Sequence, residues 1–60
     1  MLTSRERDIL CGLSRGLTNA KIADTHCLSP HTVKTHIYRI FKKIKVENRL
    51  MAAHWAAQHL

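Results

Sequence analysis

Residues 18–44 read TNAKIADTHCLSPHTVKTHIYRIFKKI, and they decide the fold. Ser29-Pro30 marks a helix start, because serine caps helix N-termini and proline fits the first helical position. Apolar side chains then recur at helical spacing and predict one buried stripe: Val33, Ile37, Ile40 and Ile44, with Phe41 beside them. The stretch therefore predicts a helix over residues 30–44.

A shorter helix over residues 19–25 precedes it, with Thr18 or Asn19 as the N-cap. Ala23 is small enough for two helices to approach closely, and three apolar residues supply a small core between them: Ile22, Leu28 and Val33. Two helices joined by a short turn form a helix-turn-helix, whose second helix projects from the domain.

The flanking sequence predicts two further helices. Thr3 and Glu6 have the spacing of a capping box, and Gly16 is a natural stop, so the first helix covers about residues 4–15. Asn48 caps a last helix over about 48–59. One side of this helix is expected to pack on the core: Ala52, Ala53, Ala56 and Leu60. We therefore predict an all-α, four-helix domain that contains a helix-turn-helix.

The charge is concentrated on one element. The formal net charge is +6, and six of the ten lysines and arginines fall between positions 34 and 49. At 100° per residue, polar and aromatic side chains share the side of helix 30–44 opposite the apolar stripe: His31, Thr35, Tyr38 and Lys42, flanked by Lys34, Arg39 and Lys45. This pattern is typical of a surface that binds a polyanion, although a solvated helix face has the same appearance.

Length and composition exclude several classes of protein. Sixty residues suffice for one small domain, so cofactor folds and two-domain clefts are not expected. Two cysteines are too few for a disulfide scaffold, which indicates a reducing compartment. No apolar run approaches 18 residues, and no signal peptide precedes the charged N-terminal segment. We expect a cytoplasmic location and no membrane partner.

Three stretches carry a resemblance to a known family: 2–6 (LTSRE), 16–23 (GLTNAKIA) and 29–36 (SPHTVKTH). Residues 42–49 (KKIKVENR) continue the pattern. The chain resembles the LuxR/FixJ (GerE-type) DNA-binding domain of bacterial transcriptional regulators over essentially its whole length, and most of all the branch of biofilm and curli regulators. The resemblance implies double-stranded DNA binding, a homodimer through the last helix, contact with RNA polymerase, and an N-terminal receiver or signal-binding domain in a response regulator.

The resemblance also assigns residues. The base-contacting positions fall on Lys34, Thr35 and Tyr38. The side chains expected on phosphates are Thr3, Thr18, Asn19, His31, Thr32, Arg39, Lys42 and Lys43. The dimer interface is expected to involve Leu50, Met51, His54, Trp55 and Gln58. Exposed leucine and methionine on one face of a helix are compatible with an interface, although a few solvent-exposed apolar residues are also common, and the resemblance favours the interface. His31 is compatible with either solvent or a phosphate.

Three positions depart from the family pattern and indicate a domain of marginal stability. His26 stands where an apolar residue is usual, and Gly12 where a larger residue is common. Cys27 occupies the turn position that favours glycine, and a positive φ there would cost roughly 1 kcal/mol.

Other chemistry is disfavoured. The cysteines and the central histidines lack the spacing of a zinc site: Cys11, His26, Cys27, His31 and His36. We interpret Cys27 as an inert turn thiol rather than a redox switch, and His36 as a packing residue. The scattered carboxylates form no catalytic arrangement, so we expect neither an enzyme nor a cofactor or metal.

Three alternative functions remain. A sigma-factor promoter-recognition domain shares the helix-turn-helix, but the complete helix over 48–59 argues against it. A helical bundle could bind an acidic protein partner through the last helix and the basic stripe. A basic amphipathic membrane helix is a third possibility, against which stand the caps and the turn, which suit folding in water.

Overall fold

The computed structural model describes residues 1–60 and contains four α-helices and no strands. They are α1 (Ser4–Ser14), α2 (Asn19–Thr25), α3 (Pro30–Ile44) and α4 (Arg49–His59). The predicted all-α class with a helix-turn-helix is confirmed, and each predicted boundary lies within one residue of the observed one. None of the four helices is long and apolar enough to cross a membrane.

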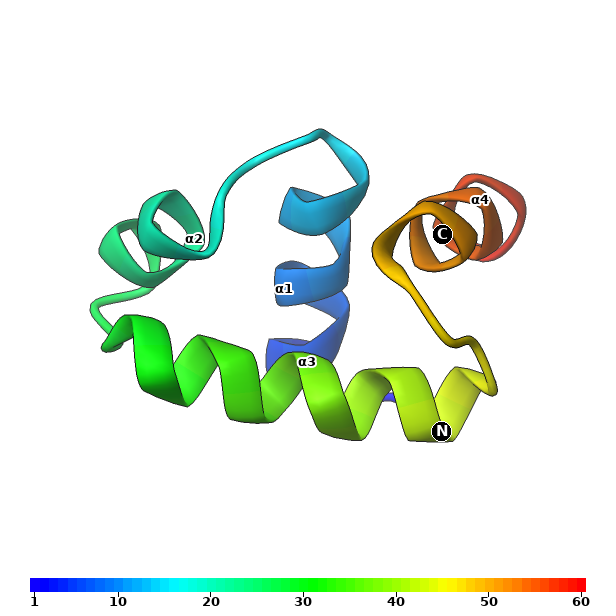
Figure 1. Ribbon diagram of the computed structural model, residues 1–60, viewed down its shortest axis with the longest axis horizontal. Helices are drawn as coiled ribbons and strands as arrows, with labels where there is room; N and C mark the ends of the chain where they lie inside the picture. The colour runs from blue at the N-terminus through cyan, green and yellow to red at the C-terminus, as the bar shows by residue number, and fades with distance from the viewer.

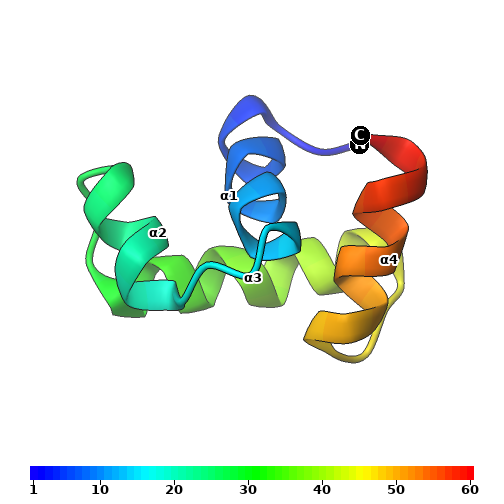
Figure 2. The same cartoon turned by 90° about the horizontal axis from the view of Figure 1, so that it is seen from above.

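The long helix α3 serves as the base on which the other three helices rest. Figure 1 shows α1 standing on the middle of α3, with α2 near one end and α4 near the other. The view from above shows the same order, with α1 between the two outer helices (Figure 2). One long side of α3 is therefore left uncovered by the rest of the chain.

Each helix begins with a side-chain cap that accepts an N–H from three residues later, which satisfies one of the free donors at a helix start. Thr3 and Glu6 form the predicted capping box, with the Thr3 N–H donating to Glu6 Oε1 at 2.9 Å. Thr18, rather than Asn19, caps α2. Ser29 and Asn48 cap α3 and α4 as predicted.

The first three helices end in one shared backbone motif. A residue with positive φ follows each helix: Gly16 (83°), Cys27 (56°) and Lys45 (60°). The N–H of the next residue then bonds to a carbonyl five residues back, at 2.8–3.2 Å. This is the Schellman arrangement, which an apolar residue after the turn commonly anchors. The anchors here pack against the core: Leu17, Leu28 and Val46.

The core lies where α1 crosses α3 and continues toward both outer helices. It is made of ten buried residues: Ile9, Leu10, Leu13, Ile22, Ala23, Val33, Ile37, Ile40, Ala52 and Ala56. Ile44 and Phe41 pack against its edge, so the predicted stripe of α3 is confirmed. The prediction that Leu60 packs on the core is wrong. Leu60 follows the end of α4 and is 49% exposed.

Gly12 lies where α1 approaches α2. A methyl group at this position would stand 3.3 Å from Ile22 Cγ1 and 3.5 Å from Leu17 Cδ1. The glycine lowers the helix propensity of α1, but it also lets Ile22 and Leu17 pack directly against the α1 backbone. The departure from the family pattern thus has a local packing role.

Candidate nucleic-acid interface

The predicted base-contacting residues all lie exposed on α3. Lys34 and Thr35 are adjacent in its second turn, and Tyr38 follows one turn later with 62% of its surface exposed. The Thr35 hydroxyl donates to the His31 carbonyl at 3.2 Å, which leaves the methyl group of Thr35 free for an apolar contact. The three side chains offer a cation, a methyl group and a phenol, and all three can contact base edges in a major groove.

Tyr38 and Lys42 form a pair on this surface. The Lys42 ammonium lies over the Tyr38 ring, 4.8 Å from its centroid. A cation at this distance is attracted by the negative face of the ring, an interaction worth about 0.5–1 kcal/mol at exposed sites. The contact joins a predicted base-contacting residue to a predicted phosphate-contacting one and restricts the rotamers of both.

The threonines predicted to contact phosphates keep a free donor even where they cap helices. Thr3 Oγ1 accepts the Glu6 N–H and Thr18 Oγ1 accepts the Lys21 N–H, both at 3.1 Å. A hydroxyl that accepts one bond can still donate its own hydrogen. Thr32 differs, because its hydroxyl is 2.9 Å from the Ser29 hydroxyl and shares a hydrogen bond with it.

Lys43 differs from the other predicted phosphate contacts because it is held by a carboxylate. Its Nζ donates to Glu6 Oε1 at 2.7 Å, and the Glu6 side chain is only 6% exposed. The hydrogen bond from Lys43, and then that from the Thr3 backbone, lower the pKa of Glu6 despite its burial. The pair ties α1 to the last turn of α3, so Lys43 has a structural role in addition to its predicted one.

The rest of the cationic surface is unpaired. Of the ten lysines and arginines, only Lys43 lies within ion-pairing distance of a carboxylate. Arg39 and His31 are both exposed on α3, at the positions predicted for phosphate contacts. The net charge of +6 is therefore presented mostly as free cations, which favours attraction of a polyanion.

Arg49 makes two hydrogen bonds in this region that were not among the predicted contacts. Its Nη1 donates to Asn19 Oδ1 at 2.8 Å, and its Nη2 donates to the Leu17 carbonyl at 2.9 Å. The two partners lie 30 and 32 positions away in the sequence, so no local pattern predicts the contact. Predicted phosphate contact Asn19 is thus held by the first residue of α4.

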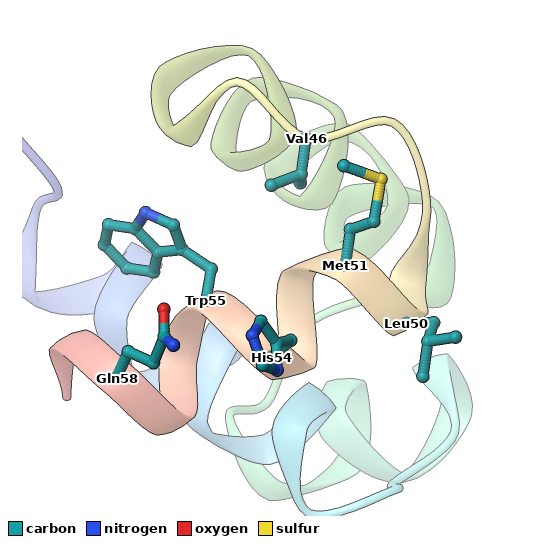
Figure 3. Close-up of a pocket in the computed structure, with 6 residues that line it drawn as sticks. All are labelled: Val46, Leu50, Met51, His54, Trp55 and Gln58. Atoms are coloured by element: carbon teal, nitrogen blue, oxygen red, sulfur yellow. The ribbon is translucent and has the colours of Figure 1, made fainter.

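The predicted interface residues of α4 line one open hollow, with a volume of about 550 Å³. Figure 3 shows Leu50, Met51, His54, Trp55 and Gln58 along one face of α4, with Val46 as an additional wall. Leu50 is 81% and Met51 42% exposed. Trp55 is also stacked on His59 at a centroid distance of 4.1 Å. The face is apolar and uncovered.

The remaining histidines and cysteines do not converge. Both Cys11 and Cys27 are free and exposed, and no group of three His, Cys, Asp or Glu side chains could hold a metal ion. The His26 carbonyl accepts a bond from Arg5 Nη1 at 3.4 Å. His36 is partly buried, as expected for a packing residue, and its buried Nδ1 has no hydrogen-bond partner.

A helix-turn-helix with an exposed, cationic second helix is typical of the DNA-binding domains of transcriptional regulators. Residues 1–56 match the family of bacterial regulatory proteins described as the luxR family. The chain belongs to this family, and the resemblance found in the sequence is confirmed.

Two curated relatives are similar to the chain over nearly all of its length. The chain is 48% identical over all its 60 residues to the CsgBAC operon transcriptional regulatory protein of Escherichia coli K12. It is 41% identical over 59 residues, 98% of the chain, to the response regulator protein VraR of Staphylococcus aureus Mu3. It spans 28% of the length of each of these relatives.

Proposed function

We propose that this domain binds a specific double-stranded DNA sequence by inserting α3 into the major groove. The observation that carries the proposal is the uncovered side of α3, where Lys34, Thr35 and Tyr38 are exposed together. A B-form major groove is about 12 Å wide and admits a single α-helix. This side of α3 does not contribute to the core, because the buried residues of α3, which are Val33, Ile37 and Ile40, lie on its opposite side.

The phosphates on either side of the groove would be held by the hydroxyls, the amide and the cations around α3. These contacts set the register of the domain on the duplex and carry little sequence information. The proposed set is Thr3, Thr18, Asn19, His31, Thr32, Arg39, Lys42 and Lys43.

We further propose that two copies pair through α4. Its exposed face is centred on Leu50, Met51 and Trp55, and burying such side chains removes apolar area from water. A face on one short helix is small for a stable dimer, so pairing would be weak in isolation and strengthened when both copies occupy one operator.

The complete protein is proposed to be a response regulator, with a receiver or signal-binding domain N-terminal to this one and a contact to RNA polymerase. The support is the relative described as a response regulator protein, of which the chain covers 28%.

The experiment is an amide chemical-shift titration of the chain with a random-sequence duplex pool and with a duplex enriched from that pool. We expect the largest shifts at residues 30–43, near Thr3 and near Thr18, and tighter binding of the enriched duplex. Shifts confined to α4, or equal affinity for all duplexes and for heparin, would favour the acidic-partner alternative instead.

Lys34→Ala tests base reading directly. We expect it to reduce discrimination between the enriched and random duplexes by about 1–3 kcal/mol. Arg7→Ala is the control, because it removes the same charge from an exposed position on α1 outside the proposed interface. An equal loss on both duplexes would remove Lys34 from the base-reading role.

A further inference from the structure

Apart from the capping bonds of Asn48 at the start of α4, the only hydrogen bonds between α4 and the preceding segments are those of Arg49. Elsewhere α4 is attached by apolar packing, mainly of Ala52 and Ala56 against the core. Figure 2 shows the first turn of α4 on the same side of the molecule as the connection between α1 and α2. Arg49 therefore links the helix proposed for pairing to a segment proposed to hold phosphate.

The Asn19 side chain is not needed to begin α2. Thr18 caps that helix by accepting the Lys21 N–H at 3.1 Å. Asn19 Oδ1 instead accepts from Arg49, and the two N–H bonds of Nδ2 have no partner within the domain. A side-chain amide has one accepting and one donating end, so a guanidinium on the oxygen determines which end is left free.

The two hydrogen bonds of Arg49 fix the orientation of its guanidinium. Its two terminal nitrogens reach two different acceptors, Asn19 Oδ1 at 2.8 Å and the Leu17 carbonyl at 2.9 Å. A planar guanidinium bonded at two points has a fixed orientation, whereas a lysine ammonium would be a single point charge. No carboxylate neutralises Arg49, so the local field favours an anion near the free end of the Asn19 amide.

We infer that Arg49 is a positioning residue, which turns the Asn19 amide so that its N–H bonds donate to a DNA phosphate. The inference rests on the proposed function and assigns a role to a residue outside the predicted interface. Because Arg49 is the first residue of α4, the phosphate contact of Asn19 would then depend on the position of α4, the helix proposed to pair.

The test compares four single variants and one double variant by fluorescence anisotropy with the enriched duplex, with thermal unfolding measured on each. Asn19→Asp keeps an acceptor for Arg49 and removes the donors. Asn48→Asp adds the same charge one residue from Arg49 and can still cap α4. We expect unfolding temperatures at or above the wild type for Asn19→Asp, with affinity at least about tenfold lower than for Asn48→Asp, the loss typical of one charge-assisted hydrogen bond.

Arg49→Met and Asn19→Ala complete the experiment as single variants and in combination. If Arg49 acts through Asn19, each change lowers affinity and the double variant binds no more weakly than Asn19→Ala alone. Additive losses would mean that Arg49 contacts DNA independently, and equal affinities of Asn19→Asp and Asn48→Asp would mean that the amide does not donate. Either result overturns the inference while leaving the proposed function intact.

Failure of the proposed function has a different signature. In that case the wild-type chain would not prefer the enriched duplex over the random pool, and the inference would fall with it. A lower unfolding temperature for Arg49→Met, with wild-type affinity at a temperature where both are folded, would show a purely structural contact and would also overturn the inference.

Discussion

At the scale of single residues, Cys27 has the clearest local conflict between side chain and backbone. It adopts φ 56° in the turn between α2 and α3, where the Leu28 N–H closes a 2.8 Å bond to the Ala23 carbonyl. A residue with a Cβ is disfavoured in this conformation, and glycine is not. The thiol is exposed and forms no disulfide.

Cys27→Gly is therefore expected to stabilise the domain by about 1 kcal/mol, because the strained φ is relieved. Denaturant unfolding at neutral pH measures the change. Cys11→Gly is the matched control: the same substitution in the middle of α1 should destabilise by a similar amount through lost helix propensity. A decrease in stability for Cys27→Gly would show that the thiol has a packing role.

At the scale of elements, one ion pair reinforces the apolar packing of α1 on α3. Glu6 is 4% exposed and is bonded by both Lys43 and the Thr3 backbone. These bonds favour the ionised carboxyl and hold its pKa below the ordinary value of 4.5. The stabilisation is therefore fully present above pH 4.5 and is lost as the pH falls through the lowered pKa.

Glu6→Gln is expected to remove much of the loss of stability below pH 4.5, because the amide does not titrate. Thermal unfolding between neutral pH and the acid range measures this. Asp8→Asn on the exposed side of α1 is the control and should leave the pH profile close to that of the wild type. An unchanged acid profile in Glu6→Gln would place the acid sensitivity elsewhere.

Helix positions could be predicted because each start is set by chemistry within four residues: Thr3, Thr18, Ser29 and Asn48 all act as caps. The end of α3 has a weaker signal in the sequence, because Lys45 adopts φ 60° at a position where glycine is usual. The contacts of Lys43 and Arg49 join residues 37 and 30 positions apart, so they depend on the packed fold. Helical periodicity predicts the exposure of Tyr38. Its contact with Lys42 also depends on the rotamers of both side chains, which the sequence pattern does not specify.

At the scale of the whole molecule, the main property is an excess of positive charge with a single ion pair. Such a domain gains affinity for DNA by releasing counterions from the phosphates that it neutralises. Four to six phosphate contacts per domain would give a slope of log K against log salt of about −4 to −5. We expect the cations to contribute unequally to this slope, because Lys43 is already paired with Glu6.

Lys42→Ala should reduce this slope by about 1, as for one lost phosphate contact. Lys43→Ala should reduce it by less and should also destabilise the domain, because the buried Glu6 carboxylate loses a partner. Anisotropy titrations over a series of salt concentrations measure both slopes. Equal reductions would indicate that the Glu6–Lys43 pair opens when DNA binds.

The hydrogen bonds that cap the start of every helix and the end of three helices join residues close in sequence. This property affects the folding kinetics. These bonds span three to five residues, so they form before much of the chain has been brought together. Helical domains dominated by such local contacts fold in microseconds to milliseconds. Temperature-jump relaxation of Trp55 fluorescence should show a single phase in this range, and a phase of seconds would contradict it.

Encounters between a protein and its partner at micromolar concentration typically take longer, from about 0.1 to 10 seconds. A chain that unfolds briefly would therefore rebuild its recognition helix before it meets the next duplex. The measured association rate would then report the encounter with DNA and not the refolding of the protein.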